Sequence, residues 1–165
     1  MNGCAMQEAA LARADQAREL YGRGRAVLVE LLKEQPENLQ AALALALLLG
    51  NLSLVDDRLG QMQTSLQAVD EGIAVLHSLP ASLANEPRVL DQIASLRLNK
   101  GATLVRHGRS KEAAECLRLV WDYRKRLWTQ RPSEVLLLRQ LQTTGNNLAQ
   151  ALLAQRQLDE AEAII

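Results

Sequence analysis

The amino-acid sequence predicts an all-α protein of antiparallel helix pairs, and three observations support this fold class. The chain has 165 residues, of which 33 are Leu and 24 are Ala, while Phe is absent and aromatic residues make up 2%. Leu and Ala favour helices, whereas sheets are built mainly from β-branched and aromatic residues. Only four prolines interrupt long segments whose apolar residues recur three or four positions apart, as they do on one face of a helix.

The first half of the chain predicts three helices. In the first, Ala and Leu residues form one apolar stripe, although Gly22 and Gly24 weaken it. The second is nearly all apolar, which indicates a buried helix, and the residues that follow it are expected to be an irregular connection. The third again carries an apolar stripe. The predicted ranges are 5–34, 37–50 and 60–83, with the connection at 51–59.

Helix boundaries are clearer in the second half. Pro87 opens a helix, and Gly108 is placed to end it in a left-handed conformation. Ser110 is placed to be the N-cap of the next helix, and Pro132 separates that helix from the following one. These helices are predicted at 87–107, 110–130, 133–155 and 158–165, which gives about seven helices in all.

A repeat with a 48-residue offset links the later helix pairs. One copy contains Asn99, Gly101, Leu104, Gly108 and Ala113, and the other contains Asn147, Ala149, Leu152, Arg156 and Ala161. Small residues at helix crossings let two helices approach closely, and Leu fills the space between them. Self-similarity of this kind predicts a solenoid of stacked helix pairs.

The string Asn-x-Gly, Leu, Gly-Arg-x-x-Glu-Ala resembles the tetratricopeptide repeat (TPR). The 48-residue spacing is similar to the lengthened repeats of kinesin light chains and of arrays attached to bacterial serine/threonine protein kinases. The resemblance implies one right-handed TPR-like α-solenoid over residues 1–165, with divergent helices over 1–86 and clearer repeats over 87–132 and 133–165. Arg156 departs from the family's usual Gly, and the turn there is expected to differ in shape.

The resemblance also implies a binding surface. In TPR arrays the first helix of each unit lines the concave face, and the Asn of the motif often contacts the ligand backbone. The matching residues are Asn99 and Asn147, with Arg106, Asn146 and Gln150 at adjoining positions. The alternative is that Asn99 and Asn147 hydrogen-bond within the scaffold or face water.

Several classes of function are disfavoured. The 19 basic and 19 acidic residues cancel, which is untypical of nucleic-acid-binding proteins. Two isolated cysteines and two isolated histidines predict no metal site, and the catalytic and phosphate-binding strings of kinases and hydrolases are absent. The sequence therefore predicts no enzyme, no cofactor and no small-molecule substrate.

The predicted location is cytoplasmic. The longest apolar run covers nine residues, 41–49, about half of the ~20 residues that a membrane-spanning helix needs. The N-terminus lacks the basic and apolar regions of a signal peptide. No membrane association is expected.

The stretch from Trp121 to Trp128 has two interpretations. Two Trp residues seven positions apart share one helix face, and Arg124, Lys125 and Arg126 lie around the rest of that helix. A nucleic-acid-binding protein would stack bases on the Trp rings and neutralise phosphates with the basic residues. The favoured interpretation is a repeat helix with two apolar anchors and a solvated basic face.

The predicted function is therefore a scaffold that binds a peptide or protein partner, such as the regulatory array of a larger bacterial signalling protein. A nucleic-acid-binding helical protein is the alternative. The chain ends inside its last predicted helix at 163–165. An uncapped repeat of this kind is expected to continue into a longer array, to be covered by a partner, or to self-associate.

Overall fold

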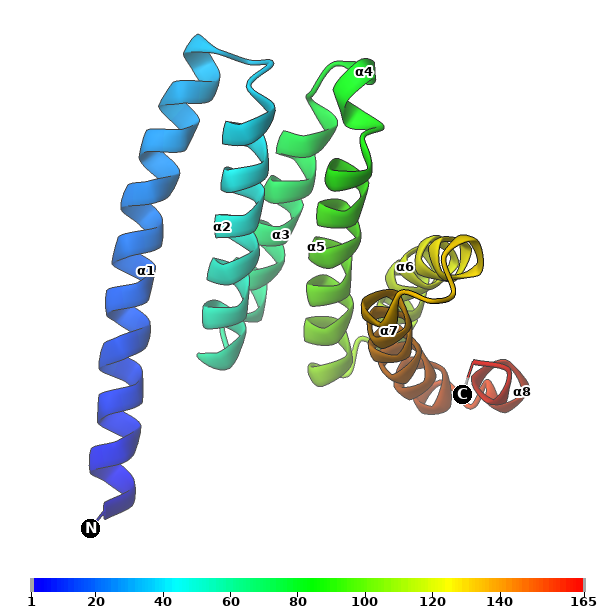
Figure 1. Cartoon of the computed structure of the whole chain (residues 1–165). Helices are drawn as coiled ribbons and strands as arrows, with labels where there is room; N and C mark the ends of the chain where they lie inside the picture. The colour runs from blue at the N-terminus through cyan, green and yellow to red at the C-terminus, as the bar shows by residue number, and fades with distance from the viewer. Residues whose placement is uncertain (1, 165) are drawn as a thin grey trace. The chain divides into compact units, whose positions relative to one another are not determined.

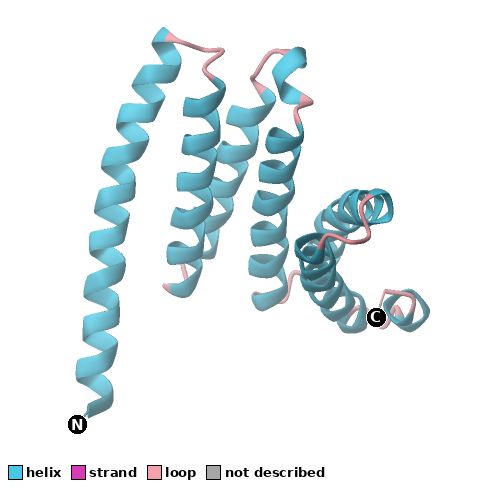
Figure 2. Ribbon diagram, in the orientation of Figure 1, coloured by secondary structure: helices cyan, strands magenta, loops and turns pink. Residues whose placement is uncertain are grey.

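The computed structural model describes residues 2–164, and within them the side chains of residues 13–164. This part of the chain is helical and contains no strand (Figures 1 and 2). It holds eight helices, one more than predicted, because a short helix, α4, precedes α5. The helices are α1 (Asn2–Glu34), α2 (Leu39–Arg58), α3 (Met62–His77), α4 (Ala81–Ala84), α5 (Pro87–Arg106), α6 (Ser110–Gln130), α7 (Val135–Ala154) and α8 (Leu158–Glu162).

Two predictions in the first half were wrong. Helix α2 continues through 51–58, where an irregular connection was expected, because Ser53, Asp56 and Asp57 are buried in the helix rather than exposed in a loop. Helix α3 ends at His77 instead of continuing to 83, since Pro80 lacks the N–H that a helix interior needs. Gly22 and Gly24 do not interrupt α1.

The chain forms two compact units, unit 1 (residues 1–96) and unit 2 (residues 97–165), with the boundary inside α5. In unit 1, helices α2, α3 and α5 bury one apolar cluster, and α1 adds partly buried residues to a second cluster around Leu45 and Leu49. In unit 2, the largest fully buried side chains are Leu104, Leu117, Leu148, Leu152, Val120 and Thr144.

Helix boundaries recur with the 48-residue period of the sequence repeat. The first helices of the pairs, α2, α5 and α7, begin at 39, 87 and 135 and end at 58, 106 and 154. The second helices, α3, α6 and α8, begin at 62, 110 and 158. We call these pairs copy 1 (α2–α3), copy 2 (α5–α6) and copy 3 (α7–α8). The sequence repeat predicts copies 2 and 3. Copy 1 lies within residues 1–86, where only divergent helices were predicted.

The turns inside the three copies share one geometry. Gly60, Gly108 and Arg156 occupy the same position of successive copies and have φ values of 73°, 74° and 60°. The next residue in each turn donates its backbone N–H to a carbonyl five positions earlier. These bonds run from Gln61 to Asp56 (2.8 Å), from Arg109 to Leu104 (2.9 Å) and from Gln157 to Leu152 (3.0 Å). The left-handed conformation of Gly108 is confirmed, and Arg156 adopts it too, so the expected difference at this turn was wrong.

Copies 2 and 3 have the predicted helix crossing. A Cβ at Gly101 would lie 2.4 Å from Cγ of Leu117, so only glycine fits there. Ala113, Ala161, Leu104 and Leu152 are buried, as predicted. The equivalent positions of copy 1 carry polar residues that are also buried: Ser53, Asp56 and Ser65.

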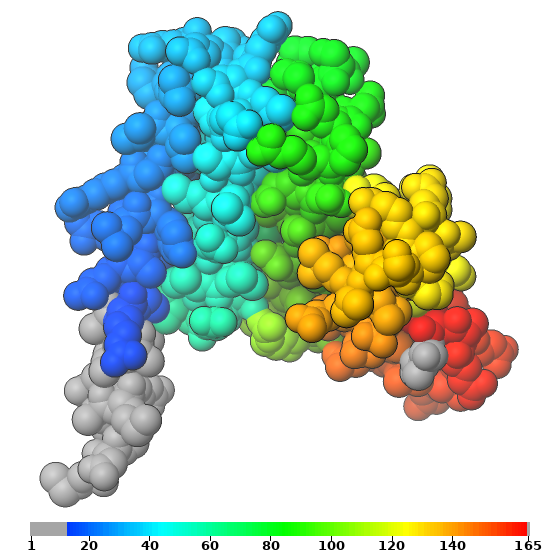
Figure 3. Space-filling view, in the orientation of Figure 1, coloured from blue at the N-terminus to red at the C-terminus, as the bar shows by residue number. Residues whose placement is uncertain are grey.

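The C-terminal part of α1 matches the second helix of a preceding copy. A Cβ at Gly24 would lie 2.8 Å from Cδ1 of Leu48, and one at Gly72 would lie 3.1 Å from Cδ1 of Leu96. Gly72 follows Gly24 by one repeat period of 48 residues, and Leu96 follows Leu48 by the same period. Helix α1 therefore packs on α2 as α3 packs on α5. In the space-filling view the described part of α1, from residue 13 on, lies directly against α2 (Figure 3).

Candidate functional site

An asparagine recurs at one position of each first helix. Asn51, Asn99 and Asn147 lie on α2, α5 and α7, each one repeat period after the last. Asn51 is exposed, while Asn99 and Asn147 are half-buried. Asn51 was missed from the sequence because Ser53 stands where the motif has glycine. The signal that could have found it is its 48-residue offset from Asn99.

Each first helix (α2, α5 and α7) has an outward face that carries this asparagine, and we call that face the Asn row. In copy 1 it carries two exposed leucines, Leu47 and Leu54, which are 55% and 38% exposed. In copies 2 and 3 it is largely polar. Of the five predicted site residues, four lie in this row: Asn99, Arg106, Asn147 and Gln150.

Asn146 lies beside the Asn row rather than in it. Its equivalent in copy 1 is Gly50, two residues before Leu52. Gly50 is buried, whereas Asn146 is exposed. With Gln142 and Gln150 it forms a line of exposed amides at every fourth residue of α7, about 6 Å apart along the axis. The side chains of these residues and of Asn147 make no hydrogen bond within the described residues.

Asn99 and Arg106 are two turns apart on α5. Both interact with other groups of the chain, so the scaffold role considered for Asn99 is compatible with the structure. Arg106 is exposed, and Arg58 occupies the equivalent position in copy 1. A basic side chain therefore follows the asparagine by two turns in copies 1 and 2, whereas copy 3 has Ala154 at this position.

The Trp121–Trp128 stretch does not form the solvated basic face expected from its sequence. Arg124 is 5% exposed and donates hydrogen bonds to the carbonyl oxygen of Gln140 (2.9 Å) and to Oγ1 of Thr144 (2.6 Å). The expectation was wrong for Arg124 because α7 supplies acceptors for its guanidinium. Only Lys125 and Arg126 of the basic triplet are therefore exposed. Trp121 is half-buried, and its ring lies against Gly145.

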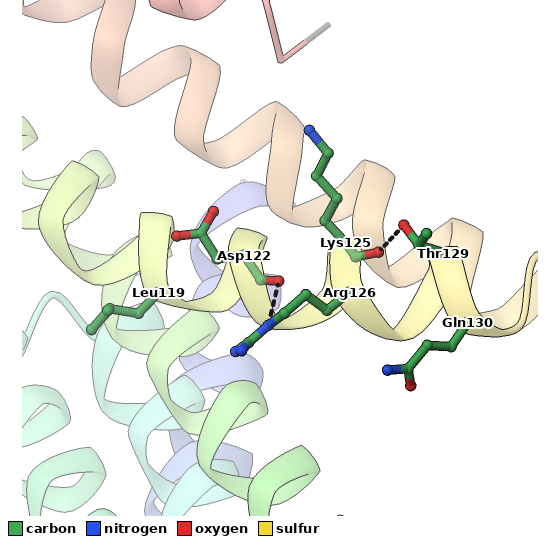
Figure 4. A pocket seen from close by; sticks show the side chains of 6 residues that line it. All are labelled: Leu119, Asp122, Lys125, Arg126, Thr129 and Gln130. Carbon is green, nitrogen blue, oxygen red and sulfur yellow. Dashed lines mark hydrogen bonds between the residues drawn. The ribbon is translucent and has the colours of Figure 1, made fainter.

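A surface hollow of about 690 Å³ lies along α6 (Figure 4). Two of its side chains bond to the backbone of their own helix: Arg126 to the carbonyl of Asp122 (3.3 Å) and Thr129 to that of Lys125 (2.9 Å). Lys125 and Gln130 leave the helix in different directions (Figure 4). The side chains do not converge on one point, as those of an enzyme site do. The lining residues are Leu119, Asp122, Lys125, Arg126, Thr129 and Gln130.

Unit 1 contains a second cavity of about 280 Å³ between α1, α2 and α3. Its walls are mostly apolar, and Lys33 is the one charged residue among them. The Lys33 ammonium already pairs with Glu30 at 2.9 Å. The lining residues are Val29, Leu32, Lys33, Pro36, Ala42, Leu45, Val75 and Ser78.

Helix α6 takes part in two arginine–carboxylate pairs. Arg118 donates two hydrogen bonds of 2.7 Å to Glu160 of α8, and Arg109 does the same to Glu112 with bonds of 2.7 and 2.6 Å. These hydrogen bonds lower the pKa of Glu160 and of Glu112 below the ordinary glutamate value. The first pair ties α8 to α6 within unit 2.

Among the residues that the structure describes, no group of three His, Cys, Asp or Glu side chains could hold a metal ion. Cys116 is half-buried, and its thiol lies 3.3 Å from the carbonyl oxygen of Arg97. By length and composition helix α2 could cross a membrane, and 44% of its most apolar window is buried inside the protein. Comparisons with protein-family models, curated proteins and solved structures find no match to this chain.

Proposed function

We propose that the chain is a non-catalytic helical-repeat module that binds a peptide or protein partner along its Asn rows. The observation that carries the proposal is the recurrence of Asn51, Asn99 and Asn147 at the 48-residue period of the helices. A residue that merely solvates a helix has no reason to keep this period. In the proposed arrangement the copies stack as a right-handed TPR-like solenoid, and the Asn rows line its concave groove.

The chemistry of the Asn rows suits an extended peptide. Each amide side chain offers both a donor and an acceptor, which match the N–H and C=O of a peptide group. The Leu pair of copy 1, Leu47 and Leu54, suits apolar side chains of the partner. Arg58 and Arg106 suit acidic ones, because opposite charges raise the rate of association and set its register.

The biological context of the proposal comes from the resemblance to lengthened TPR arrays. We place the chain as a cytoplasmic scaffold or regulatory array, such as one attached to a bacterial serine/threonine kinase. This role needs no cofactor and no membrane.

The test uses a twelve-residue peptide selected from a random library on the whole chain. Its affinity is measured by calorimetry for the wild type and for the double variant Asn147→Ala/Gln150→Ala. We expect the affinity to fall at least about tenfold, which corresponds to about 1.4 kcal/mol. The matched control is Gln63→Ala/Gln67→Ala, an exposed amide pair with similar spacing on the second helix α3. Equal losses in both variants, or selection of no peptide, would contradict the proposal.

A further inference from the structure

Two residues at which α1 meets α2 differ in chemistry from the residues at the equivalent positions of the other copies. Arg18 of α1 is equivalent to Leu66 and Ala114, and Asp56 of α2 is equivalent to Leu104 and Leu152. All four equivalents are buried and apolar. At this one place the repeat therefore has a charged pair where its other copies have apolar side chains.

The pair is poorly compensated. The side chain of Asp56 is 3% exposed, and its Oδ1 lies 3.0 Å from Nε of Arg18, but this oxygen accepts no hydrogen bond. The Arg18 side chain is 37% exposed and thus in contact with water. Burying a carboxylate carries a large desolvation penalty, which an imperfectly aligned ion pair does not fully offset. Separating α1 from α2 at this point would rehydrate Asp56.

The two halves of α1 are attached differently. Leu28, Val29 and Leu32 pack against the second apolar cluster of unit 1. No described residue in either half of α1 is fully buried, so the halves differ in the kind of contact that they make. Residues 13–25 make the long-range polar contacts, which are Arg18 with Asp56 and Arg25 with Glu71 (2.8 Å). Gly22, which has no Cβ to restrict its backbone and no neighbour within 4 Å of where a Cβ would lie, is placed between Arg18 and Leu28, where a hinge would be needed.

From these three observations we infer that the N-terminal half of α1 is a releasable arm. The ion pair between Arg18 and Asp56 is the latch that holds it on α2, and the segment from Leu28 to Leu32 is the anchor. Release exposes the buried carboxylate and the neighbouring end of α2, while unit 1 stays folded. Salt favours the release, because dissolved ions stabilise the separated, hydrated charges of Arg18 and Asp56 more than they stabilise the closed pair, whose carboxylate is buried.

Amide hydrogen exchange on the full chain tests the inference. The backbone amides of 16–24 are compared with those of 28–34 and of α3, at low salt and at about 1 M NaCl. We expect high salt to speed exchange in 16–24 at least about threefold relative to α3, since an undocked helix end of this length is only marginally stable in water. An unchanged ratio between the two segments would overturn the inference.

Three variants distinguish a latch from a purely structural pair. Arg18→Leu/Asp56→Leu, which restores the apolar residues of the other copies, should slow exchange in 16–24 and abolish its salt dependence. Arg18→Gln, which leaves the buried Asp56 carboxylate without its partner, should speed it at low salt. Glu19→Gln, which breaks the exposed pair with Arg23 on the same helix, should leave the salt dependence as in the wild type. Exchange that rises equally in α2, α3 and 16–24 of Arg18→Gln would assign the pair to global stability and overturn the inference.

Discussion

The contact of α1 with α2 and the contact of α6 with α7 join a second helix to the next first helix at the same register, but by opposite means. Between α6 and α7, the ring of Trp121 fits against Gly145 and the buried Arg124 bonds to Thr144. Between α1 and α2, the polar half of α1 is held by the ion pair of Arg18 with Asp56 and its apolar half by partly buried residues, while the pair of Arg25 with Glu71 joins α1 to α3. The repeat period thus specifies where helices cross, and the residues at each crossing decide how firmly they hold.

Truncating a side chain at an apolar crossing should have the largest effect. Leu152 is fully buried at the position equivalent to Asp56. Leu152→Ala should lower the free energy of unfolding by about 2–5 kcal/mol, because it leaves a cavity that the helices cannot fill. Chemical denaturation measures the loss. Asp56→Leu combined with Arg18→Leu should be neutral or stabilising, and a loss comparable to that of Leu152→Ala would show that the two crossings are alike.

The close approach at Gly101 should tolerate no side chain. A Cβ there would clash with Cγ of Leu117, a branch atom of a fully buried residue. Gly101→Ala should destabilise unit 2 by about 2 kcal/mol even though alanine is the better helix former. Gly22→Ala is the matched control, since a Cβ at this helical position meets nothing within 4 Å. It should stabilise the chain by about 1 kcal/mol, and thermal unfolding of both variants compares them.

The buried hydrogen bond between Arg124 and Thr144 should contribute more to the free energy of unfolding than an exposed hydrogen bond of another threonine. Thr144→Val keeps the shape of the side chain and removes the acceptor of Arg124, which should lower stability by about 1–2 kcal/mol. Thr143→Val removes an exposed bond from Oγ1 to the carbonyl of Arg139. Its expected effect on the urea midpoint is close to zero. Equal urea midpoints for the two variants would contradict the buried hydrogen bond between Arg124 and Thr144.

The three left-handed turns provide a smaller test. Arg156 holds a φ of 60°, which is unfavourable for a residue with a Cβ. Arg156→Gly should therefore raise stability by up to about 1 kcal/mol, and Gly108→Ala should lower it by a similar amount. Opposite shifts of the thermal midpoint would confirm that the two turns are equivalent in energy as well as in geometry.

The pair of Arg118 with Glu160 should have the smallest effect, and it should depend on pH. The pKa of Glu160 is lowered in the folded state, so its contribution to stability is present above the ordinary glutamate pKa and is lost as the pH falls through the lowered value. The NMR titration of Glu160 should shift upward in Arg118→Gln. An unshifted titration would mean that the two groups do not interact in solution.

Much of copies 2 and 3 could be predicted from the sequence. The boundaries of α5 follow from Pro87 and Gly108, because these residues have strong positional preferences. Helix α6 begins at Ser110, but the prediction of Ser110 as its N-cap was wrong, since Arg109 occupies that position and no side chain caps the helix. The burial of Leu104 and Ala113, and of their equivalents in copy 3, followed from the repeat. These positions use small and apolar residues, which are what a helix crossing needs.

Copy 1 could not be identified in the same way, because its crossing carries Ser53, Asp56 and Ser65 instead of small apolar residues. Polar residues in a window indicate a loop unless the tertiary structure buries them. The burial of Arg124 was missed for the converse reason. Its acceptors, the backbone of Gln140 and the hydroxyl of Thr144, lie on another helix and leave no pattern in the sequence.

The central claim is that one 48-residue unit organises this chain, and a duplication tests it most directly. Residues 87–134 are inserted a second time after residue 134, which adds one unit in register, and helicity is followed by circular dichroism during thermal unfolding. Because repeat stability is a sum over units and their neighbours, the longer chain should keep its helicity per residue and unfold at the same or a higher temperature. Duplicating only 87–120 adds a segment shorter than the period, which puts the following helices out of register and should lower both values. If the in-register chain loses helicity as the out-of-register chain does, the 48-residue unit is not the organising element.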